Sequence, residues 1–132
     1  MASPRPEDVA ALVRSSAGDG VWLPVDGSSM LPTISAGSQV RVVSVSRRPR
    51  IAEIWAFCDP NGEIIVHRYR RQDHAQRFVF RGDNVKQSDM PVDAERLIGV
   101  VRVIDANGTK RAAGWLARVR WIAHRAGARI RR

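Results

Sequence analysis

Cysteine and lysine are scarce in this chain of 132 residues. Cys58 is the one cysteine, so no internal disulfide can form, which argues against a secreted, disulfide-stapled scaffold. Lysine occurs only at Lys86 and Lys110, although Lys and Arg together number 22. No metal-ligand spacing surrounds Cys58, which we interpret as a small core residue, and we expect neither a metal nor a cofactor.

Long apolar runs are also missing. No stretch is long enough to cross a bilayer. The N-terminus carries Pro4, Pro6, Glu7 and Asp8 in place of the basic start and apolar core of a signal peptide. We therefore expect a cytoplasmic protein, with peripheral contact to the inner face of a membrane as a further expectation.

The net charge of +9 is concentrated near the C-terminus. From Lys110 to Arg132 there are eight Lys or Arg residues and no acidic residue. Such a balance permits contact with nucleic acid or anionic membranes. No aromatic ladder or nucleic-acid motif accompanies the arginines, so a nucleic-acid partner is not expected. A non-catalytic nucleic-acid or protein-binding module stays open as an alternative.

The pattern along the chain predicts a mainly β fold in three parts. An N-terminal segment (1–20) with a short helix around residues 9–13 precedes a β domain (21–108), and a basic amphipathic helix occupies 109–132. Asp59-Pro60-Asn61-Gly62 predicts a hairpin, because Asn-Gly accepts the positive φ angles of tight turns. The strands are expected at residues 21–25, 39–46, 51–57, 63–69, 78–80 and 97–104, the last of these closed by a turn at 105–108.

The helical pattern after Ala112 has an apolar and a basic face. The apolar residues are Trp115, Leu116, Val119, Ile122, Ala123, Ala126 and Ile130, and the arginines opposite them are Arg118, Arg125, Arg129 and Arg132. Two interpretations stay open: the apolar face packs on the β domain, or residues 112–132 lie on an anionic membrane. Trp121 falls on the polar face, which favours an interface.

The turn Gly27-Ser28-Ser29-Met30-Leu31-Pro32-Thr33 links two strand-like runs and presents hydroxyl groups beside a flexible glycine. A serine becomes a nucleophile only when a base removes its proton, and arginine stays protonated. Lys86 is expected in a polar loop and Lys110 beyond the last strand, so a serine–lysine pair is not expected. A histidine remains as the candidate base; an ordinary loop remains as the alternative to a catalytic turn.

Among the histidines, His74 falls in a polar loop and His124 on the basic helix, whereas His67 lies on a predicted strand. It is either a half-buried histidine satisfied by a carbonyl or a base held on a rigid strand. A carboxylate is needed to orient such a base. Asp83 and Asp89 are the candidates, although Asp also favours turns for its own backbone contacts.

These segments together resemble the signal peptidase and SOS-repressor peptidase superfamily of serine peptidases. The similar segments are Gly27 to Thr33, Ile65-Val66-His67-Arg68-Tyr69, Arg81-Gly82-Asp83-Asn84 with Asp89, and Leu97-Ile98-Gly99-Val100-Val101. The resemblance spans about residues 20 to 104 and implies the coiled β-sheet core of that superfamily. The branch with histidine as base, which includes the endoplasmic-reticulum and archaeal signal peptidases, is the most similar.

The resemblance also implies residue roles. Ser29 would be the nucleophile, His67 the general base, and Asp83 and Asp89 the acidic partners. The oxyanion and substrate-binding positions would be Gly27, Ser28, Met30 and Pro32, and the second oxyanion donor stays open because Gly27 has no side chain.

The implied activity is that of a serine endopeptidase acting on a peptide or precursor protein, from which it removes a leader or tail. A self-cleaving regulator is an alternative. The chain departs from the family's usual Gly-Asp pairs at Gly37-Ser38 and at Ala52-Glu53. We expect these departures to affect turns rather than chemistry.

Overall fold

The computed structural model describes the backbone of residues 4–130 and their side chains except those of residues 115, 116 and 126–130. Strands make up most of the regular structure, so the predicted mainly β fold is confirmed. The helices are α1 (Pro6–Ser16), α2 (Trp115–Ile130) and a 3₁₀ turn, η1 (Ala94–Arg96). The strands are β1 (Val21–Pro24), β2 (Gln39–Val43), β3 (Ile54–Cys58), β4 (Ile64–Gln72), β5 (Phe78–Arg81), β6 (Leu97–Ala106) and β7 (Thr109–Ala112).

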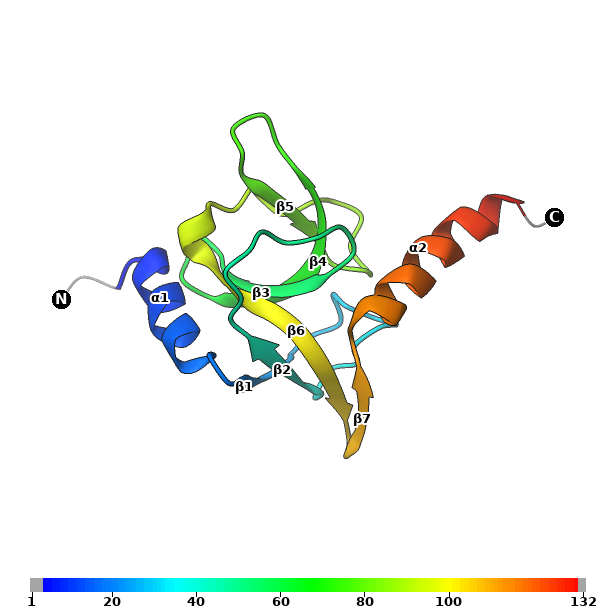
Figure 1. Ribbon diagram of the computed structural model, residues 1–132, viewed down its shortest axis with the longest axis horizontal. Helices are drawn as coiled ribbons and strands as arrows, with labels where there is room; N and C mark the ends of the chain where they lie inside the picture. Colours follow the sequence, from blue (N-terminus) through cyan, green and yellow to red (C-terminus); the bar gives the residue numbers. More distant parts are fainter. Residues whose placement is uncertain (1–3, 131–132) are drawn as a thin grey trace.

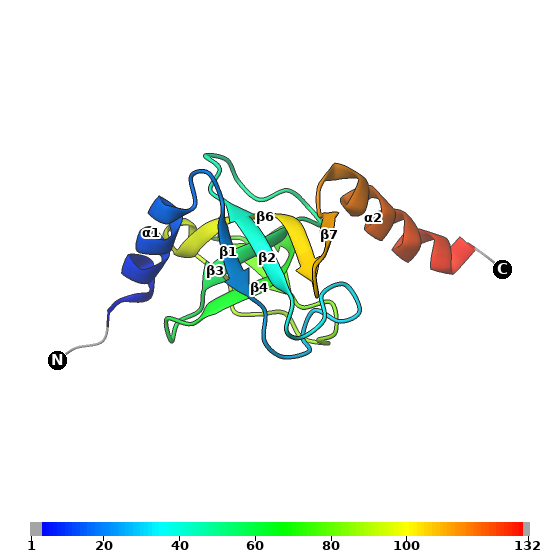
Figure 2. The same cartoon turned by 90° about the horizontal axis from the view of Figure 1, so that it is seen from below.

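One antiparallel sheet runs in the order β1-β2-β6-β3-β4-β5, with β7 paired to β6 (Figure 1). Strand β6 organises it, because Val100 pairs with Val43 of β2 on one edge and with Trp55 of β3 on the other. Farther along that second edge, Val103 to Ala106 pair with β7. The helices lie at opposite ends of this sheet, and α2 extends away from it (Figures 1 and 2).

Strand β3 is buried on both faces and divides the core in two. Ile54, Ala56 and Cys58 join the cluster that packs against α1 through Ala10. The alternate side chains, Trp55 and Phe57, join an aromatic cluster with residues of β4, β5 and β6. This period of two follows from the strand pleat. A continuous apolar run is therefore required in β3, because neither face meets water.

The third predicted strand, 51–57, begins later than expected, at Ile54. Residues 51 and 52 form a turn in which Ala52 adopts φ +73°. That left-handed conformation favours glycine. Ala52, where the chain departs from the family's usual Gly-Asp pair, therefore lies in a turn, as expected from the sequence.

The prediction that the β6 region is the last strand is wrong. Asn107 and Gly108 both have positive φ and return the chain as β7, which pairs with β6. Lys110 thus lies on a strand rather than beyond the sheet. All four β7 residues are exposed, so the strand has no apolar alternation. The Asn-Gly pair is the signal that could have predicted this hairpin.

The predicted C-terminal helix is present from Trp115. No helix within the described residues is long and apolar enough to span a bilayer. The predicted assignments of Trp115, Leu116, Ala126, Arg129 and Ile130 to helix faces concern side chains outside the described residues, and Arg132 lies outside them altogether.

Candidate active site

Ser29 lies in the loop between β1 and β2. The neighbouring residue Met30 fixes its position. The Met30 side chain is 1 % exposed and packs in the core cluster against α1. Backbone bonds from Leu31 N–H to Ser28 O and from Ile34 N–H to Met30 O close the turn on either side. Burying Met30 therefore leaves Ser29 half-buried at the surface of the sheet.

His67 meets Ser29 from β4. It stands opposite Trp55 in the β3–β4 register and is 8 % exposed. Its ring contacts the Phe57 ring edge-on, with centroids 6.4 Å apart. His67 Nε2 lies 3.0 Å from Ser29 Oγ, and its Nδ1 lies 2.5 Å from Asp89 Oδ2. The three side chains form one continuous chain of hydrogen bonds from hydroxyl to carboxylate.

The two aspartates that the sequence left equivalent have different partners. Asp89 faces His67 and is held by the bond from its N–H to Phe80 O. Among the described residues, Asp83 has no hydrogen bond with His67 but accepts two bonds from Arg68, at 2.8 and 2.7 Å. Thr33 donates to the same carboxylate at 2.5 Å. Asp89, and not Asp83, is therefore positioned to orient the histidine.

Asp83 and Arg68 form a buried ion pair whose side chains are 6 % and 4 % exposed. Arg68 also donates to Ala52 O at 2.7 Å, so the left-handed turn at Ala52 presents its carbonyl to this pair. Through Thr33 the pair holds the far end of the serine loop. Its role in the described structure is to tie the loop to β4.

The turn after β5 holds the backbone of the serine loop. Asn84 N–H donates to Ser29 O at 2.8 Å, and its side-chain amide donates to Ser28 O at 3.1 Å. A Cβ built on Gly82 would lie 2.5 Å from Ser29 O and 3.0 Å from His67 Nε2. Glycine is thus required there by close approach rather than by its φ angle. No role for Gly82 or Asn84 was predicted from the sequence, although both adjoin Asp83 in the segment Arg81-Gly82-Asp83-Asn84.

The other predicted binding positions lie around Ser29 in different ways. Gly27 has φ +76° and is exposed, as are Ser28 and Pro32. Among the described residues, neither the N–H of Ser29 nor the hydroxyl of Ser28 has a hydrogen-bond partner within the protein. Met30 is turned into the core, where its sulfur accepts from Asp83 N–H at 3.4 Å.

A small cleft of about 230 Å³ opens beside Ser29 and His67. Its other walls are Pro24 to Asp26, which begin at the last residue of β1, and Glu63 to Val66, which lead into β4. β1 is the edge strand of the sheet, and β5 pairs with β4 only from Arg68 onward. The cleft therefore lies between two stretches of backbone that each have one unpaired edge.

Other reactive side chains lie away from this arrangement. His74 and His124 are exposed, as are Lys86 and Lys110. Burial raises the pKa of the Cys58 thiol, which is 0 % exposed at the end of β3. Among residues 4–130, no three His, Cys, Asp or Glu side chains gather so that they could hold a metal ion.

The family model of Peptidase S24-like proteins matches residues 4–102. The chain belongs to the Peptidase S24-like family. This match covers the sheet as far as the first part of β6, together with Ser29, His67 and both aspartates, and it confirms the superfamily that the sequence motifs resemble. It is common to peptidases and self-cleaving repressors and does not single out the Ser-His branch. No curated protein and no solved structure matched this S24-like chain.

Proposed function

We propose that this S24-like protein is a serine endopeptidase that cleaves a leader or tail peptide from a precursor. The observation that carries the proposal is the hydrogen-bonded chain from Ser29 Oγ through His67 to Asp89, with distances of 3.0 and 2.5 Å. Both distances are within the reach needed for proton transfer and for orienting a base. The half-burial of Ser29 lets a peptide reach its oxygen.

In the proposed reaction, Ser29 Oγ attacks the peptide carbonyl carbon while His67 Nε2 takes the hydroxyl proton. The same proton passes to the leaving amine as the C–N bond breaks and an acyl-enzyme forms. Water then attacks the ester with His67 again as base, which regenerates Ser29. Asp89 accepts the hydrogen bond from Nδ1–H, which fixes the histidine tautomer and stabilises the imidazolium.

Charge develops on the carbonyl oxygen during the attack and needs hydrogen-bond donors. The Ser29 N–H is proposed as the first donor, since it has no acceptor within the described part of the chain. The Ser28 hydroxyl, also without a protein partner there, is the candidate second donor. Gly27 allows the exposed turn that presents both groups.

The substrate is proposed to bind as an extended strand in the cleft between β1 and β4. Each of these strands has an unpaired edge beside the cleft, and an extended peptide can pair with such an edge. The cleft's volume of about 230 Å³ suits small side chains next to the scissile bond. Pro32 lies farther along the serine loop and is proposed as an outer contact.

A mixture of extended peptides incubated with the protein, with products identified by mass spectrometry, tests this function. We expect cleavage products that are absent with Ser29→Ala and His67→Ala, each checked for folding by its thermal transition. Products that persist in both folded variants, or no products from any peptide or full-length precursor, would exclude an endopeptidase acting in trans. Cleavage of the protein's own chain, dependent on Ser29, would instead support the self-cleaving alternative.

A further inference from the structure

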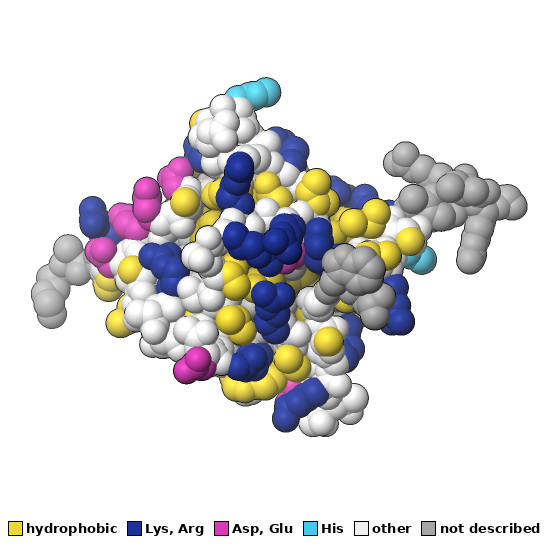
Figure 3. Space-filling model, in the orientation of Figure 1, with side chains coloured by type: hydrophobic (Ala, Val, Ile, Leu, Met, Phe, Trp, Pro, Cys, Tyr) yellow, Lys and Arg dark blue, Asp and Glu magenta, His cyan; other side chains and the backbone are white. Residues whose placement is uncertain are grey.

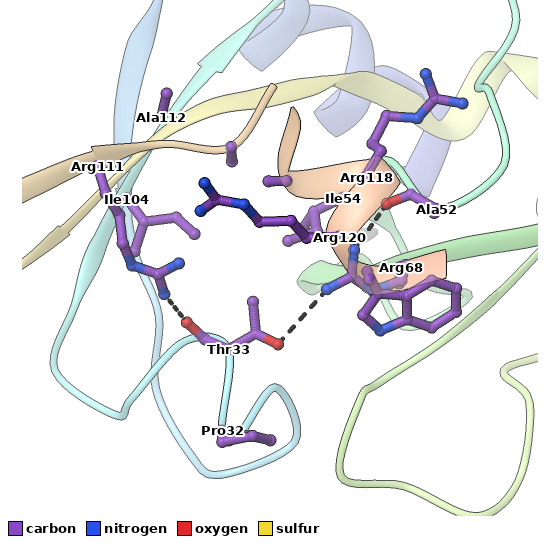
Figure 4. Close-up of a pocket in the computed structure, with 13 residues that line it drawn as sticks. Pro32, Thr33, Ala52, Ile54, Arg68, Ile104, Arg111, Ala112, Arg118 and Arg120 are labelled. Atoms are coloured by element: carbon purple, nitrogen blue, oxygen red, sulfur yellow. Dashed lines mark hydrogen bonds between the residues drawn. The ribbon is translucent and has the colours of Figure 1, made fainter. Parts of the chain in front are cut away.

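A second cavity, separate from Ser29, lies between α2 and the sheet (Figure 4). Its volume is about 620 Å³. The lining combines four arginines with small apolar side chains and one tryptophan, and includes no acidic residue. The lining residues are Pro32, Thr33, Ala52, Ile54, Arg68, Ile104, Arg111, Ala112, Ala113, Ala117, Arg118, Arg120 and Trp121.

Two of the arginines are exposed and have no acidic partner among the described residues. Arg68 is bound to Asp83, and Arg118 donates to Ile51 O at 2.9 Å. Arg120, by contrast, has neither a hydrogen bond nor an ion pair with any described residue, and its side chain extends from α2 into the pocket (Figure 4). Arg111 of β7 reaches the opposite wall, where it donates to Thr33 O. Both are exposed, so their charges are not neutralised within the described protein.

Helix α2 packs on the sheet through a side chain that the sequence placed on its polar face. Trp121 stacks with Arg68, whose guanidinium carbon lies 4.6 Å from the ring centroid, and with Arg125 at 4.9 Å. Val119 and Ile122 of the predicted apolar face are 41 % and 44 % exposed. Packing of the apolar face on the β domain therefore does not account for α2 by itself. The helix contacts the sheet through Trp121, but Val119 and Ile122 stay exposed to solvent.

The surroundings of α2 are strongly basic. Residues 107–132 include no Asp or Glu. Figure 3 shows basic side chains across the middle of the face and toward α2, while most acidic side chains lie toward α1. Exposed apolar residues beside arginines, without acids, are the pattern of a helix that rests in the headgroup layer of an anionic membrane.

We infer that the pocket between α2 and the sheet binds the headgroup of an anionic phospholipid when the protein lies on a membrane surface. Arg111 and Arg120 contact the phosphate from opposite walls. Val119 and Ile122 enter the boundary between headgroups and acyl chains. This site is independent of the proposed hydrolysis, since none of these residues lies in the cleft beside Ser29 and His67.

The exposed apolar pair favours a membrane over nucleic acid. A phosphate backbone would use the arginines but would leave Val119 and Ile122 in water. Trp121, the aromatic residue that lines the pocket, already stacks with Arg68, Arg70 and Arg125, so a stacked base would have to compete with these contacts.

Co-sedimentation with phosphatidylcholine vesicles, with or without phosphatidylglycerol, tests the inference on the full chain carrying Ser29→Ala. We expect binding to the anionic vesicles alone, with an affinity that falls as salt rises. Arg111→Ala with Arg120→Ala should weaken binding about thirtyfold. Val119→Ser with Ile122→Ser should weaken it about tenfold or more, and this exposed pair tests the site even if the arginine variant fails to fold.

The matched control is Arg71→Ala with Arg77→Ala, which removes the same charge from exposed positions in the β4–β5 hairpin. It should leave the affinity within about threefold of the parent. Equal losses in the control and the Arg111/Arg120 variant would overturn the inference, as would equal binding to neutral vesicles. Displacement from vesicles by inorganic phosphate or by duplex DNA, at matched ionic strength, would also overturn it by identifying a free anion or a nucleic acid as the ligand.

Discussion

Asp83 and Asp89 belong to one loop but do different physical work. Asp89 is 27 % exposed at its side chain and bonds His67, whereas Asp83 is buried and pairs with Arg68. A carboxylate beside a histidine base affects its tautomer and its cation. A carboxylate in a buried ion pair instead affects stability, because its loss leaves the partner's charge unpaired. At the scale of single residues, the two should therefore separate in experiments.

Asp89→Asn should lower kcat about 10⁴-fold, because an amide favours the wrong histidine tautomer. The unfolding free energy should change little, since the position is partly exposed. Asp83→Asn should instead leave kcat largely unchanged in the folded protein and lower the unfolding free energy by about 3–5 kcal/mol. Denaturant unfolding and peptide cleavage measured on both variants check this. Equal activity losses in folded protein would contradict the assignment of Asp89 as the orienting group.

Gly82→Ala should inactivate the proposed enzyme without replacing any reacting group, although the new Cβ would also lie only 3.0 Å from His67 Nε2. The new Cβ would lie 2.5 Å from Ser29 O, so the serine loop or the turn must move. A displacement of about 1 Å can cost about a hundredfold in rate. Cleavage kinetics check this, and Gly18→Ala is the matched control because its Cβ would meet no atom within 4 Å. Full activity in Gly82→Ala would show that the site tolerates rearrangement.

At the scale of elements, Glu53 joins β3 to the loop that precedes it. Arg47 binds both of its oxygens, and Arg50 N–H and Trp55 Nε1 donate to Oε1. Burial by itself would raise the pKa of Glu53, but these donors together outweigh it and lower the pKa below 4.5. A lowered pKa means that the ionised group stabilises the fold above its unfolded pKa. That stabilisation is lost as the pH falls through the folded value.

Glu53→Gln should therefore destabilise the protein at pH 7 by about 2–3 kcal/mol, the usual loss for hydrogen bonds to a charged group. The gap between variant and parent should narrow as the pH falls below about 4.5. Urea unfolding from pH 7 to below about 4.5 measures the difference in unfolding free energy. Glu63→Gln, at an exposed position, is the control and should change the unfolding free energy little at any pH in this range. A gap independent of pH would mean that the charge of Glu53 does not contribute.

Much of the sheet could be predicted from sequence, because β3 and β6 contain runs of apolar residues that are buried. β7 could not, since its four exposed residues have no such pattern. The position of Trp121 was also beyond reach. Helical spacing placed it on the polar face, but its partner there is Arg68, which a sequence pattern cannot bring next to it.

At the scale of the molecule, the site depends on contacts between distant segments. His67 could be chosen as the candidate base because it is the histidine on a predicted strand, whereas its pairing with Ser29 followed from the family resemblance. The choice between Asp83 and Asp89 could not be made, because both follow β5 and only the folded loop shows which one faces the ring. The close approach of Gly82 to the serine loop and the hydrogen bonds from Asn84 to that loop also become visible only in the folded structure.

The molecule also divides its two proposed activities between separate cavities. The cleft beside Ser29 lies between β1 and β4, and the arginine-lined pocket lies under α2. The serine loop links them, since Ser29 lines the first and Pro32 and Thr33 line the second. A protein resting on a membrane through α2 would thus hold the loop that carries Ser29 close to that surface.

Labelling with a fluorophosphonate, read by mass spectrometry of the modified peptide, tests whether Ser29 is a nucleophile activated by His67. We expect a single adduct on Ser29, absent in Ser29→Ala and slowed at least about a hundredfold in folded His67→Ala, because the hydroxyl then has no base. Labelling at the same rate in all three proteins, or an adduct on Ser28 in place of Ser29, would contradict it.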